Sequence, residues 1–163
     1  SMSDRIAILN HGRLVQAGAP GELYERPRTR FVADFLGKSN FLEGTVRQPA
    51  PGGFMLEAGA SRLAVAHGQG AALPPGTRSL LSLRPEKIAL LAEGETAENQ
   101  VEGRILSWSY LGAGFALRIA TPDLGELRAV LPAWKSPVAP AEDLPVRLGW
   151  SADAAVPVEE DAA

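Results

Sequence analysis

A short internal repeat is the feature that most constrains how this chain folds. The segment 40–46 (NFLEGTV) resembles the segment 99–105 (NQVEGRI), and Asn99 lies 59 positions after Asn40. A weaker similarity has a spacing of 67 positions. It aligns Leu81, Leu83 and Glu86 with Leu148, Trp150 and Asp153. The difference of eight residues is expected in loops of the second half. The repeat predicts two similar half-modules that share one core.

From Asn40 onward the pattern is that of short β-strands separated by turns. Glycine and proline are abundant (17 and 13 residues), which favours many short strands over long helices. We therefore predict a mainly β fold, an OB-like small barrel or sandwich, over residues 38–158. The end of the chain, from Ala152, is rich in Ala, Pro and acidic residues and is expected to fray, with a flexible tail at 159–163. The expected strands are 41–47, 54–57, 62–66, 80–84, 101–110, 116–120, 127–131 and 146–150.

A β-hairpin and two short helices are predicted before the barrel. Residues 6–9 and 13–17 are strands, and Asn10 and Gly12 are expected to supply the positive φ of the turn between them. The first strand is apolar on both faces, so it needs cover that a hairpin alone cannot supply. Residues 19–26 form a first helix, and Thr29 caps a second one over 30–36 that ends at Gly37. We assign residues 1–37 to a separate N-terminal unit.

The stretch 81–88 (LSLRPEKI) contains a strand that proline stops. Leu81 and Leu83 alternate with Ser82 and Arg84, as in a strand buried on one face. Pro85 ends the pairing because it has no N–H to donate. Arg84 and Glu86 flank this proline, close enough to pair with each other or with a partner.

The charged corner has two interpretations. The Arg84–Glu86 pair is either a structural clip or a contact with a subunit or domain, and local ion pairs are usually worth little. The second repeat keeps an acid, Asp153, but has Ser151 and Ala152 where Arg84 and Pro85 stand. The barrel therefore does not need the arginine and the proline in both halves. If the contact is functional, Arg84→Ala should weaken association or regulation by more than it lowers domain stability.

Composition excludes several classes of function. The formal net charge of −3 argues against a general nucleic-acid surface, and we predict no nucleic-acid partner. There is no cysteine and only two histidines, His11 in the hairpin turn and His67 in a loop, so we predict no metal site and no catalytic residue. No apolar run reaches the roughly 20 residues of a spanning helix and no signal peptide opens the chain, so we predict a cytosolic protein.

Two further motifs suggest binding only superficially. Gly112 and Gly114 lie in a pattern that lacks the third glycine and the following helix of a nucleotide loop, so we expect a hairpin turn there. The aromatic residues Trp108, Tyr110 and Phe115 are typical of nucleic-acid platforms on OB barrels, but with net acidity we expect them to pack in the core.

Several segments together resemble one known family. Residues 3–18 resemble the segment just after the switch histidine of ABC-transporter ATPases, and residues 20–42 resemble the bridge out of that domain. The stretch 82–88 resembles the marker of the C-terminal regulatory (TOBE) domain. Residues 99–103 and 110–112 resemble the second half of that domain. The type that the chain most resembles is the ATP-binding subunit of spermidine/putrescine-like importers.

The resemblance implies that the chain is a fragment. Residues 1–37 would be a C-terminal remnant of the nucleotide-binding domain, and the rest of that domain's sheet would cover the hairpin. The sequence has no Gly-x-x-x-x-Gly-Lys-Ser/Thr loop, no signature loop and no switch histidine. We therefore predict no ATPase activity and no cofactor for the fragment, whereas ATP and Mg would act in the parent protein.

The resemblance also implies two alternative functions. The first is a regulatory and dimerisation module, with candidate interface residues Asn40, Phe41, Arg84, Pro85, Glu86, Tyr110 and Gly112. The second is a small-ligand sensor for oxyanions or polyamines, in which Ser107, Ser109 and the Gly112 turn would supply donors. The expected partners are the membrane subunits of a transporter and a second copy of the chain, in a homodimer with or without exchanged N-terminal segments. The parent protein would then be cytoplasmic, at the inner face of the membrane.

Overall fold

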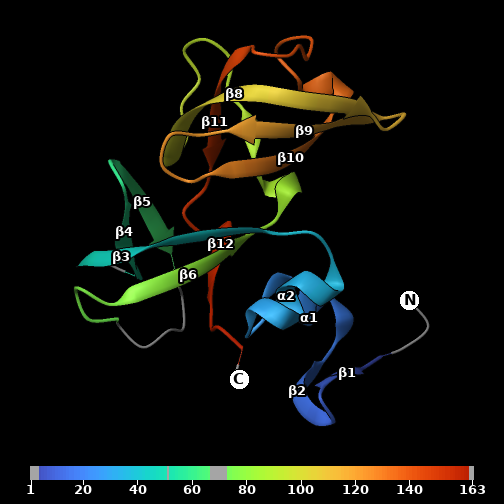
Figure 1. The fold of residues 1–163 in the computed structure, drawn as a ribbon, viewed down its shortest axis with the longest axis vertical. Helices are drawn as coiled ribbons and strands as arrows, with labels where there is room; N and C mark the ends of the chain where they lie inside the picture. Colours follow the sequence, from blue (N-terminus) through green and yellow to red (C-terminus); the bar gives the residue numbers. More distant parts are fainter. Residues whose placement is uncertain (1–3, 51, 67–72, 162–163) are drawn as a thin grey trace.

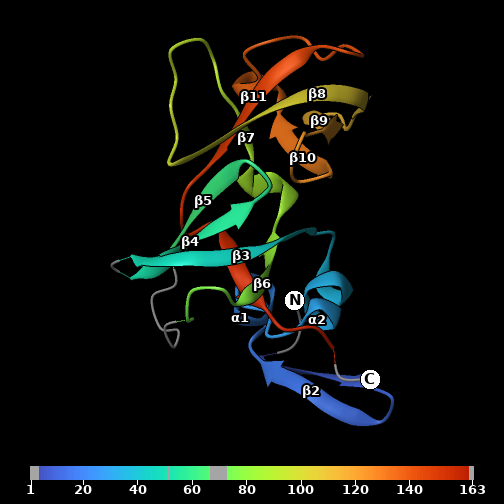
Figure 2. The ribbon, with the colours of Figure 1, turned by 60° about the vertical axis from the view of Figure 1, so that its left-hand side comes forward.

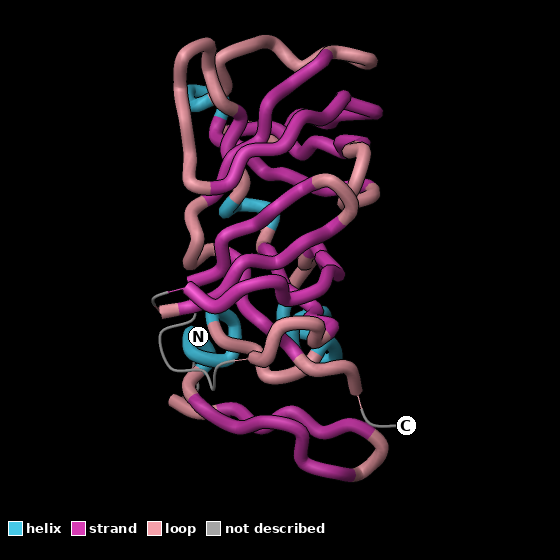
Figure 3. The backbone as a smooth tube through the Cα atoms, turned by 90° about the vertical axis from the view of Figure 1, so that its left-hand side faces the viewer, coloured by secondary structure: helices cyan, strands magenta, loops and turns pink. Residues whose placement is uncertain are grey.

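Two five-stranded antiparallel sheets, with a hairpin and two helices at one end, make up the fold. The computed structural model describes residues 4–50, 52–66 and 73–161. Figure 1 shows the two sheets one above the other, with the helices and the hairpin below the first sheet. Figure 3 shows the few helical segments among a majority of strands. The predicted mainly β fold, an OB-like barrel or sandwich of two similar half-modules, is confirmed.

The N-terminal unit is built as expected, with one change in the turn. The elements are β1 (Ile6–Asn10), β2 (Arg13–Gly18), α1 (Pro20–Glu25) and α2 (Arg30–Leu36). Positive φ falls on His11 (51°) and Gly12 (76°), and not on Asn10, because Asn10 is the last residue that pairs across the hairpin. Thr29 caps α2 as predicted, since its Oγ1 accepts from the Val32 N–H at 3.2 Å. In Figure 2 the hairpin lies beneath the helices, at the end of the molecule away from the second sheet.

The two sheets have the same internal order. In the first sheet the order is β12-β6-β3-β4-β5, and in the second it is β10-β9-β8-β11-β7. The strands of the first sheet are β3 (Asn40–Ala50), β4 (Gly53–Ala58), β5 (Ser61–Ala66), β6 (Arg78–Leu83) and β12 (Ala155–Val158). Those of the second are β7 (Ala89–Leu90), β8 (Asn99–Tyr110), β9 (Gly114–Ala120), β10 (Glu126–Pro132) and β11 (Pro145–Trp150).

Strand register confirms the repeat. Asn40 pairs with Leu83 and Asn99 pairs with Trp150, which are the positions related by the spacings of 59 and 67. Both long strands carry a bulge at equivalent places, one between Val46 and Gln48 and the other between Ile105 and Ser107. A bulge increases the local twist and bends the strand. The same bend in β3 and β8 lets each half curve over the shared core.

The last strand of each half lies in the sheet of the other half. β7 follows β6 in sequence but pairs with β11, and β12 follows β11 but pairs with β6. The expectation that the chain frays from Ala152 is therefore wrong. β12 is held by its ladder with β6, in which Ala155 pairs with Leu83, and Pro157 is tolerated because β12 lies at the sheet edge. In the segment 159–163, Glu159, Glu160 and Asp161 contact the start of α2.

One apolar core spans both sheets, and a smaller one lies under the helices. The large core includes Leu42 and Leu81 from the first sheet and Ile105 and Leu148 from the second. The small core consists of Ile8, Leu23 and Val32, with partly buried neighbours. β6 is buried on both faces, not on one as predicted, because its second face lies against the N-terminal unit. Ser82 is 2% and Arg84 4% exposed on that face.

Candidate functional site at the joint between the N-terminal unit and the barrel

We call the contact of α1, α2 and the linker after α2 with residues 84–87 the joint. It forms where β6 ends and the chain crosses to the second sheet. Arg84 is the last extended residue, and Pro85 opens the 3-10 turn η1 (Pro85–Lys87) that leads into β7. Pro85 fits this position because the first residue of a helical turn needs no N–H donor and its φ is fixed near the helical value. The turn thus holds Arg84 and Glu86 on a rigid support next to α1 and α2.

Arg84 links the barrel to the N-terminal unit by four hydrogen bonds. Its Nη1 donates to the carbonyl oxygens of Ala33 (2.8 Å), Gly37 (3.0 Å) and Lys38 (3.3 Å), and its Nη2 to that of Tyr24 (3.2 Å). The guanidinium carbon lies 4.1 Å from the centre of the Tyr24 ring, a cation–π contact. Every one of these partners belongs to α1, α2 or the linker after α2. Among the described residues, the buried Nε of Arg84 has no hydrogen-bond partner.

Glu86 and Lys87 contact α1 from the exposed side of the joint. The Tyr24 hydroxyl donates a short hydrogen bond to the Glu86 carboxylate. The Lys87 ammonium lies 3.0 Å from the Glu25 carboxylate. The predicted Arg84–Glu86 ion pair is absent from the ion pairs of the described residues. Both groups contact Tyr24 instead: the guanidinium lies over its ring and the carboxylate accepts a hydrogen bond from its hydroxyl.

Burial changes the acidity of the two central groups of the joint. Burial and the hydrogen bond to Glu86 raise the pKa of Tyr24 to about 12. Burial lowers the pKa of Arg84, while Tyr24 and the surrounding carboxylates oppose this shift. An arginine stays protonated under such conditions because its ordinary pKa is so high. The joint therefore contains a buried, positively charged guanidinium that needs the carbonyl oxygens around it.

Asn40 and Asn99, which are equivalent positions of the repeat, make the same kind of side-chain contact. The Asn40 side chain donates to the Arg128 carbonyl at 2.9 Å and accepts from the Arg128 N–H at 2.7 Å. Asn99 bonds the N–H and the carbonyl of Ala64 in the same way, at 2.8 and 2.9 Å. Each asparagine thus joins its own half to an edge strand of the other half.

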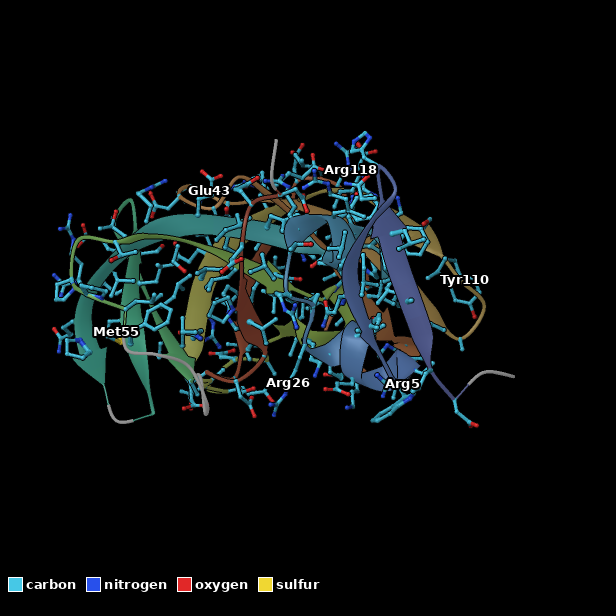
Figure 4. All side chains as sticks on the ribbon, turned by 90° about the horizontal axis from the view of Figure 1, so that it is seen from below. Arg5, Arg26, Glu43, Met55, Tyr110 and Arg118 are labelled. Carbon is cyan, nitrogen blue, oxygen red and sulfur yellow. The ribbon has the colours of Figure 1, made fainter. Side chains whose placement is uncertain are left out.

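The other predicted interface residues do not gather at the joint. Phe41 is half-buried beneath the Arg30 guanidinium, 4.5 Å from the ring centre. Tyr110 (63% exposed) and Gly112 (φ 84°) lie at the β8–β9 turn, and Figure 4 shows Tyr110 pointing away from the body of the molecule. Trp108 is 44% exposed, so the expectation of core packing is wrong for Trp108 and Tyr110. Ile105 is the last buried residue of β8, so the end of this strand contributes nothing to the core.

Sequence reasoning missed Tyr24, Glu25 and Lys87 as parts of the site. Lys87 lies in the stretch with Arg84 and Glu86, and a search for charges in that stretch would have included it. Tyr24 and Glu25 lie about 60 residues earlier, at separations of 60 to 62 from their partners. No local pattern in the sequence indicates that α1 packs against η1.

A second feature is a basic groove on the outer face of β8, β9 and β10. It has a volume of about 400 Å³ and is lined by Ser107, Ser109, Arg118 and Arg128, with Lys38 and Pro85 also in its wall. Arg118 donates to Glu126 at 2.7 and 3.0 Å and to the Ser107 hydroxyl at 3.2 Å. The hydrogen bond between Arg118 and Glu126 raises the pKa of Arg118 and lowers that of Glu126. Gly112, predicted to act with these serines, does not line the groove.

Residues 4–50, 52–66 and 73–161 contain neither a metal-binding cluster nor a membrane-spanning helix. No group of three or more His, Cys, Asp or Glu side chains lies there in an arrangement that fits a metal ion. No helix in that part of the chain is long and apolar enough to cross a membrane. His67, predicted to lie in a loop, is outside the described residues.

Comparison with known proteins identifies the second part of the chain. A family model described as the TOBE domain matches residues 81–158. Residues 81–158 form a TOBE domain. The match begins within β6 and ends with β12, so it includes the joint residues Arg84, Pro85 and Glu86. The strands β3, β4 and β5 lie outside the match, although the register makes them the counterparts of β8, β9 and β10.

The chain is similar in sequence to subunits of importers. It is 38% identical over 130 residues to the spermidine/putrescine import ATP-binding protein PotA of Rubrobacter xylanophilus, covering 79% of this chain and 34% of the relative. It is 40% identical over 137 residues to PotA 1 of Pseudomonas aeruginosa, covering 76% and 32%, and 41% identical over 130 residues to PotA of Frankia alni, covering 74% and 28%. The chain thus spans about a third of the length of these relatives.

A solved structure supports the fold. The cytoplasmic molybdate-binding protein ModG, with molybdate bound, superposes with a TM-score of 0.59 at 15% identity, covering 74% of this chain and 95% of that protein. At this level of identity the likeness concerns the fold, in which two small β-modules are joined.

Proposed function

We propose that the chain is a regulatory and interaction module of the ATP-binding subunit of an ABC importer for polyamine-like substrates. The relatives that support this proposal are ATP-binding proteins for spermidine and putrescine import. The observation that carries the regulatory part is the set of four hydrogen bonds from Arg84 to α1, α2 and the linker. ATP and Mg would be bound by the rest of the subunit, and this part would have no ATPase activity.

The joint makes the position of the barrel depend on that of the N-terminal unit. If α1 and α2 moved a short distance from η1, the Arg84 guanidinium would lose acceptors while it was still buried, which is costly. A small displacement is therefore opposed, and the two parts move together or separate through a distinct opened state. Such a two-state element is what regulation of a remote ATPase requires.

The experiment that tests the proposal uses the complete subunit within its transporter. Tyr24→Phe and Glu86→Ala each remove the hydrogen bond between Tyr24 and Glu86 and leave Arg84 in place. We expect both variants to change the substrate-stimulated rate of ATP hydrolysis severalfold without lowering the melting temperature by more than a few degrees. Glu142→Gln, at an exposed glutamate far from the joint in sequence, is the control. Unchanged rates in both joint variants would overturn the proposal.

The partners are proposed on similar grounds. The membrane subunits of the importer would bind the complete subunit, at the cytoplasmic side of the membrane. A second copy would pair with this chain, either side by side or with the N-terminal segments exchanged, because Leu9 (59% exposed) and Leu14 (62% exposed) leave apolar surface on the hairpin. We expect a dimeric mass by light scattering at high micromolar concentration. A monomeric mass there would count against the pairing.

A small-ligand sensor is the second candidate function. Ser107 and Ser109, predicted as donors for an oxyanion, line a groove that also contains arginine and lysine side chains. Calorimetric titration with molybdate, sulfate and polyamines separates the candidates. Specific micromolar binding would favour the sensor, whereas the absence of heat would leave the interaction module.

A further inference from the structure

The chain that follows β12 lies against the start of α2. The Glu159 N–H donates to the Arg28 carbonyl at 3.0 Å, and the Glu159 carbonyl accepts from the Arg30 N–H at 2.9 Å. These two hydrogen bonds form a parallel β-bridge. In Figure 1 this part of the chain runs down beside the helices. We call residues 159–161 the closing segment. It connects the barrel to the N-terminal unit at a second place, away from the joint.

The closing segment supplies acceptors that the first turn of α2 needs. The first N–H groups of a helix have no partner within the helix itself. The Arg30 N–H bonds to the Glu159 carbonyl, and the Phe31 N–H donates to the Asp161 carboxylate at 3.1 Å. The next N–H of this turn bonds to the side chain of Thr29. The closing segment thus completes the capping of α2, and its removal would leave two donors without a protein acceptor.

The barrel holds α2 at both ends of the helix. At the C-terminal end, the carbonyl oxygens of Ala33 and Gly37 accept hydrogen bonds from Arg84. Arg84 directly follows the end of β6 and Glu159 directly follows the end of β12, and these two strands are antiparallel. The two attachments therefore lie at opposite ends of one ladder. Acidic groups lie near the start of α2 and a guanidinium near its end, which is the arrangement that the helix dipole favours.

The two attachments differ in their exposure to water. Arg84 is 4% exposed, whereas all three residues of the closing segment are exposed. The ion pair between Arg30 and Glu160 joins half-exposed side chains at 3.1 Å, and the same guanidinium lies over the Phe41 ring. Water can replace the partners of an exposed segment when it leaves, whereas Arg84 would lose its acceptors while it is buried. The closing segment therefore opens before the Arg84 contacts do.

The loop between α1 and α2 connects the closing segment to the hairpin. Gln16 of β2 is 9% exposed, and its side-chain amide donates to the Arg26 carbonyl at 3.1 Å and accepts from the Arg28 N–H at 2.9 Å. The Arg28 carbonyl accepts from the Glu159 N–H. Arg28 is thus bonded to the hairpin through its N–H and to the closing segment through its carbonyl. A movement at the closing segment would therefore reach β2.

We propose that the closing segment is a releasable latch, and that Arg84 is the hinge about which α2 turns when the latch opens. With the latch closed, both ends of α2 are fixed to the barrel. With the latch open, the start of α2 and the loop before it move away from the barrel, and the hairpin follows through Gln16. The hydrogen bonds of Arg84 remain in both states. An influence of the latch on a remote ATPase rests on the function proposed above, whereas the latch itself does not.

Residue-resolved amide hydrogen exchange tests the latch in this chain. A chain that ends at residue 158 lacks the closing segment, and Asp161→Ala removes one of its acceptors. In the shortened chain we expect exchange about tenfold faster at the Arg30 and Phe31 amides and also faster at the Arg28 amide, which the segment does not bond. Exchange in α1, β4, β8 and β9 should not change. Glu142→Ala, at an exposed glutamate outside the closing segment, is the control and should alter none of these rates.

Three results of this experiment would overturn the proposal. The first is unchanged exchange at the Arg30 and Phe31 amides of the shortened chain. The second is faster exchange at these two amides without any change at Arg28, because the closing segment would then only cap α2. The third is equally faster exchange in α1, because Arg84 would then not act as a hinge. If the shortened chain lost protection in both sheets, Asp161→Ala, which deletes no backbone, would decide between the same outcomes at Phe31 and Arg28.

The effect on the complete subunit is tested separately in Asp161→Ala. We expect the substrate-stimulated rate of ATP hydrolysis to change about twofold or more, in the same direction as in Tyr24→Phe, because both variants loosen the N-terminal unit on the barrel. A changed rate in Tyr24→Phe together with an unchanged rate in Asp161→Ala would overturn control by the latch and leave the role of the joint in place. Neither rate bears on the exchange experiment, which decides whether the latch exists.

Discussion

At the scale of single residues, Asn40 and Asn99 each pair with the backbone of an edge strand, one in each half. β5 and β10 are edge strands, whose backbone groups would otherwise lack partners on one side. Asn99 satisfies both backbone groups of Ala64 in β5, and Asn40 satisfies both of Arg128 in β10. A side-chain amide can do this because its NH2 group donates and its carbonyl oxygen accepts, so one amide can pair with both the carbonyl and the N–H of a backbone residue. We therefore interpret Asn40 as a residue that closes the barrel, although the sequence suggested an interface residue.

Replacing either asparagine should lower stability markedly. In Asn40→Ala the backbone N–H and carbonyl of Arg128 lose their partner, and in Asn99→Ala those of Ala64 do. Leaving such groups unpaired costs about 2–3 kcal/mol of unfolding free energy. Urea denaturation measures this loss, and Gln48→Ala, at an exposed glutamine of β3, is the control. If neither asparagine variant lost more unfolding free energy than Gln48→Ala, the role of the asparagines in barrel closure would be contradicted.

Tyr24 should make stability depend on pH at high pH. Its pKa in the folded chain is raised to about 12, above the ordinary value of 10, mainly by burial. Because the folded pKa is raised, the contribution of the neutral hydroxyl is complete below pH 10 and is lost as the pH rises towards 12. The difference in unfolding free energy between wild type and Tyr24→Phe should therefore shrink over this range, by about 1 kcal/mol for a partly exposed group.

The measurement is urea denaturation of both proteins at a series of pH values from 8 to 12. Tyr110→Phe, at an exposed tyrosine, should show a difference from the wild type that does not vary in this way. A Tyr24→Phe difference that is constant up to pH 12 would show that the hydroxyl is not shielded in the folded chain.

At the scale of elements, the exchange of β7 and β12 between the sheets joins the two halves. β12 covers one edge of the first sheet, where Ala155 and Pro157 pair with Leu83 and Leu81. The sequence of this strand, rich in Ala and Pro, has little strand propensity of its own. Its structure comes from the ladder with β6, about 70 residues earlier in the chain. This is why the sequence alone indicated fraying at the position where the structure has a strand.

Two truncations test the role of β12. A chain that ends at residue 154 loses β12 and exposes the edge of β6, so we expect it to lose its cooperative unfolding transition. A chain that ends at residue 158 keeps the strand and loses the two backbone hydrogen bonds of Glu159 and the exposed Arg30–Glu160 ion pair, so we expect a loss of about 2 kcal/mol with a transition that stays cooperative. Circular dichroism during thermal unfolding distinguishes the two. A cooperative transition of normal midpoint in the shorter chain would contradict the requirement for β12.

At the scale of the whole molecule, local patterns predicted the parts but not their assembly. The repeat, the strands, the Thr29 cap and the stop at Pro85 follow from short-range alternation, capping and the missing N–H of proline. The partners of Arg84 do not, because its acceptors lie 46 to 60 residues away and a carbonyl oxygen has no signature in the sequence. The exposure of Tyr110 also depends on which elements pack beside the end of β8, which the sequence of that strand does not show.

The central claim of this account is that Arg84 is a joint between the N-terminal unit and the barrel. Amide hydrogen exchange of wild type and Arg84→Lys, read segment by segment, tests it most directly, because lysine keeps the charge but cannot reach four carbonyl oxygens. We predict faster exchange in α1, α2 and the linker, with unchanged protection in β3, β4, β8, β9 and β11. A uniform loss of protection over both sheets, or no loss in α1 and α2, would contradict the claim.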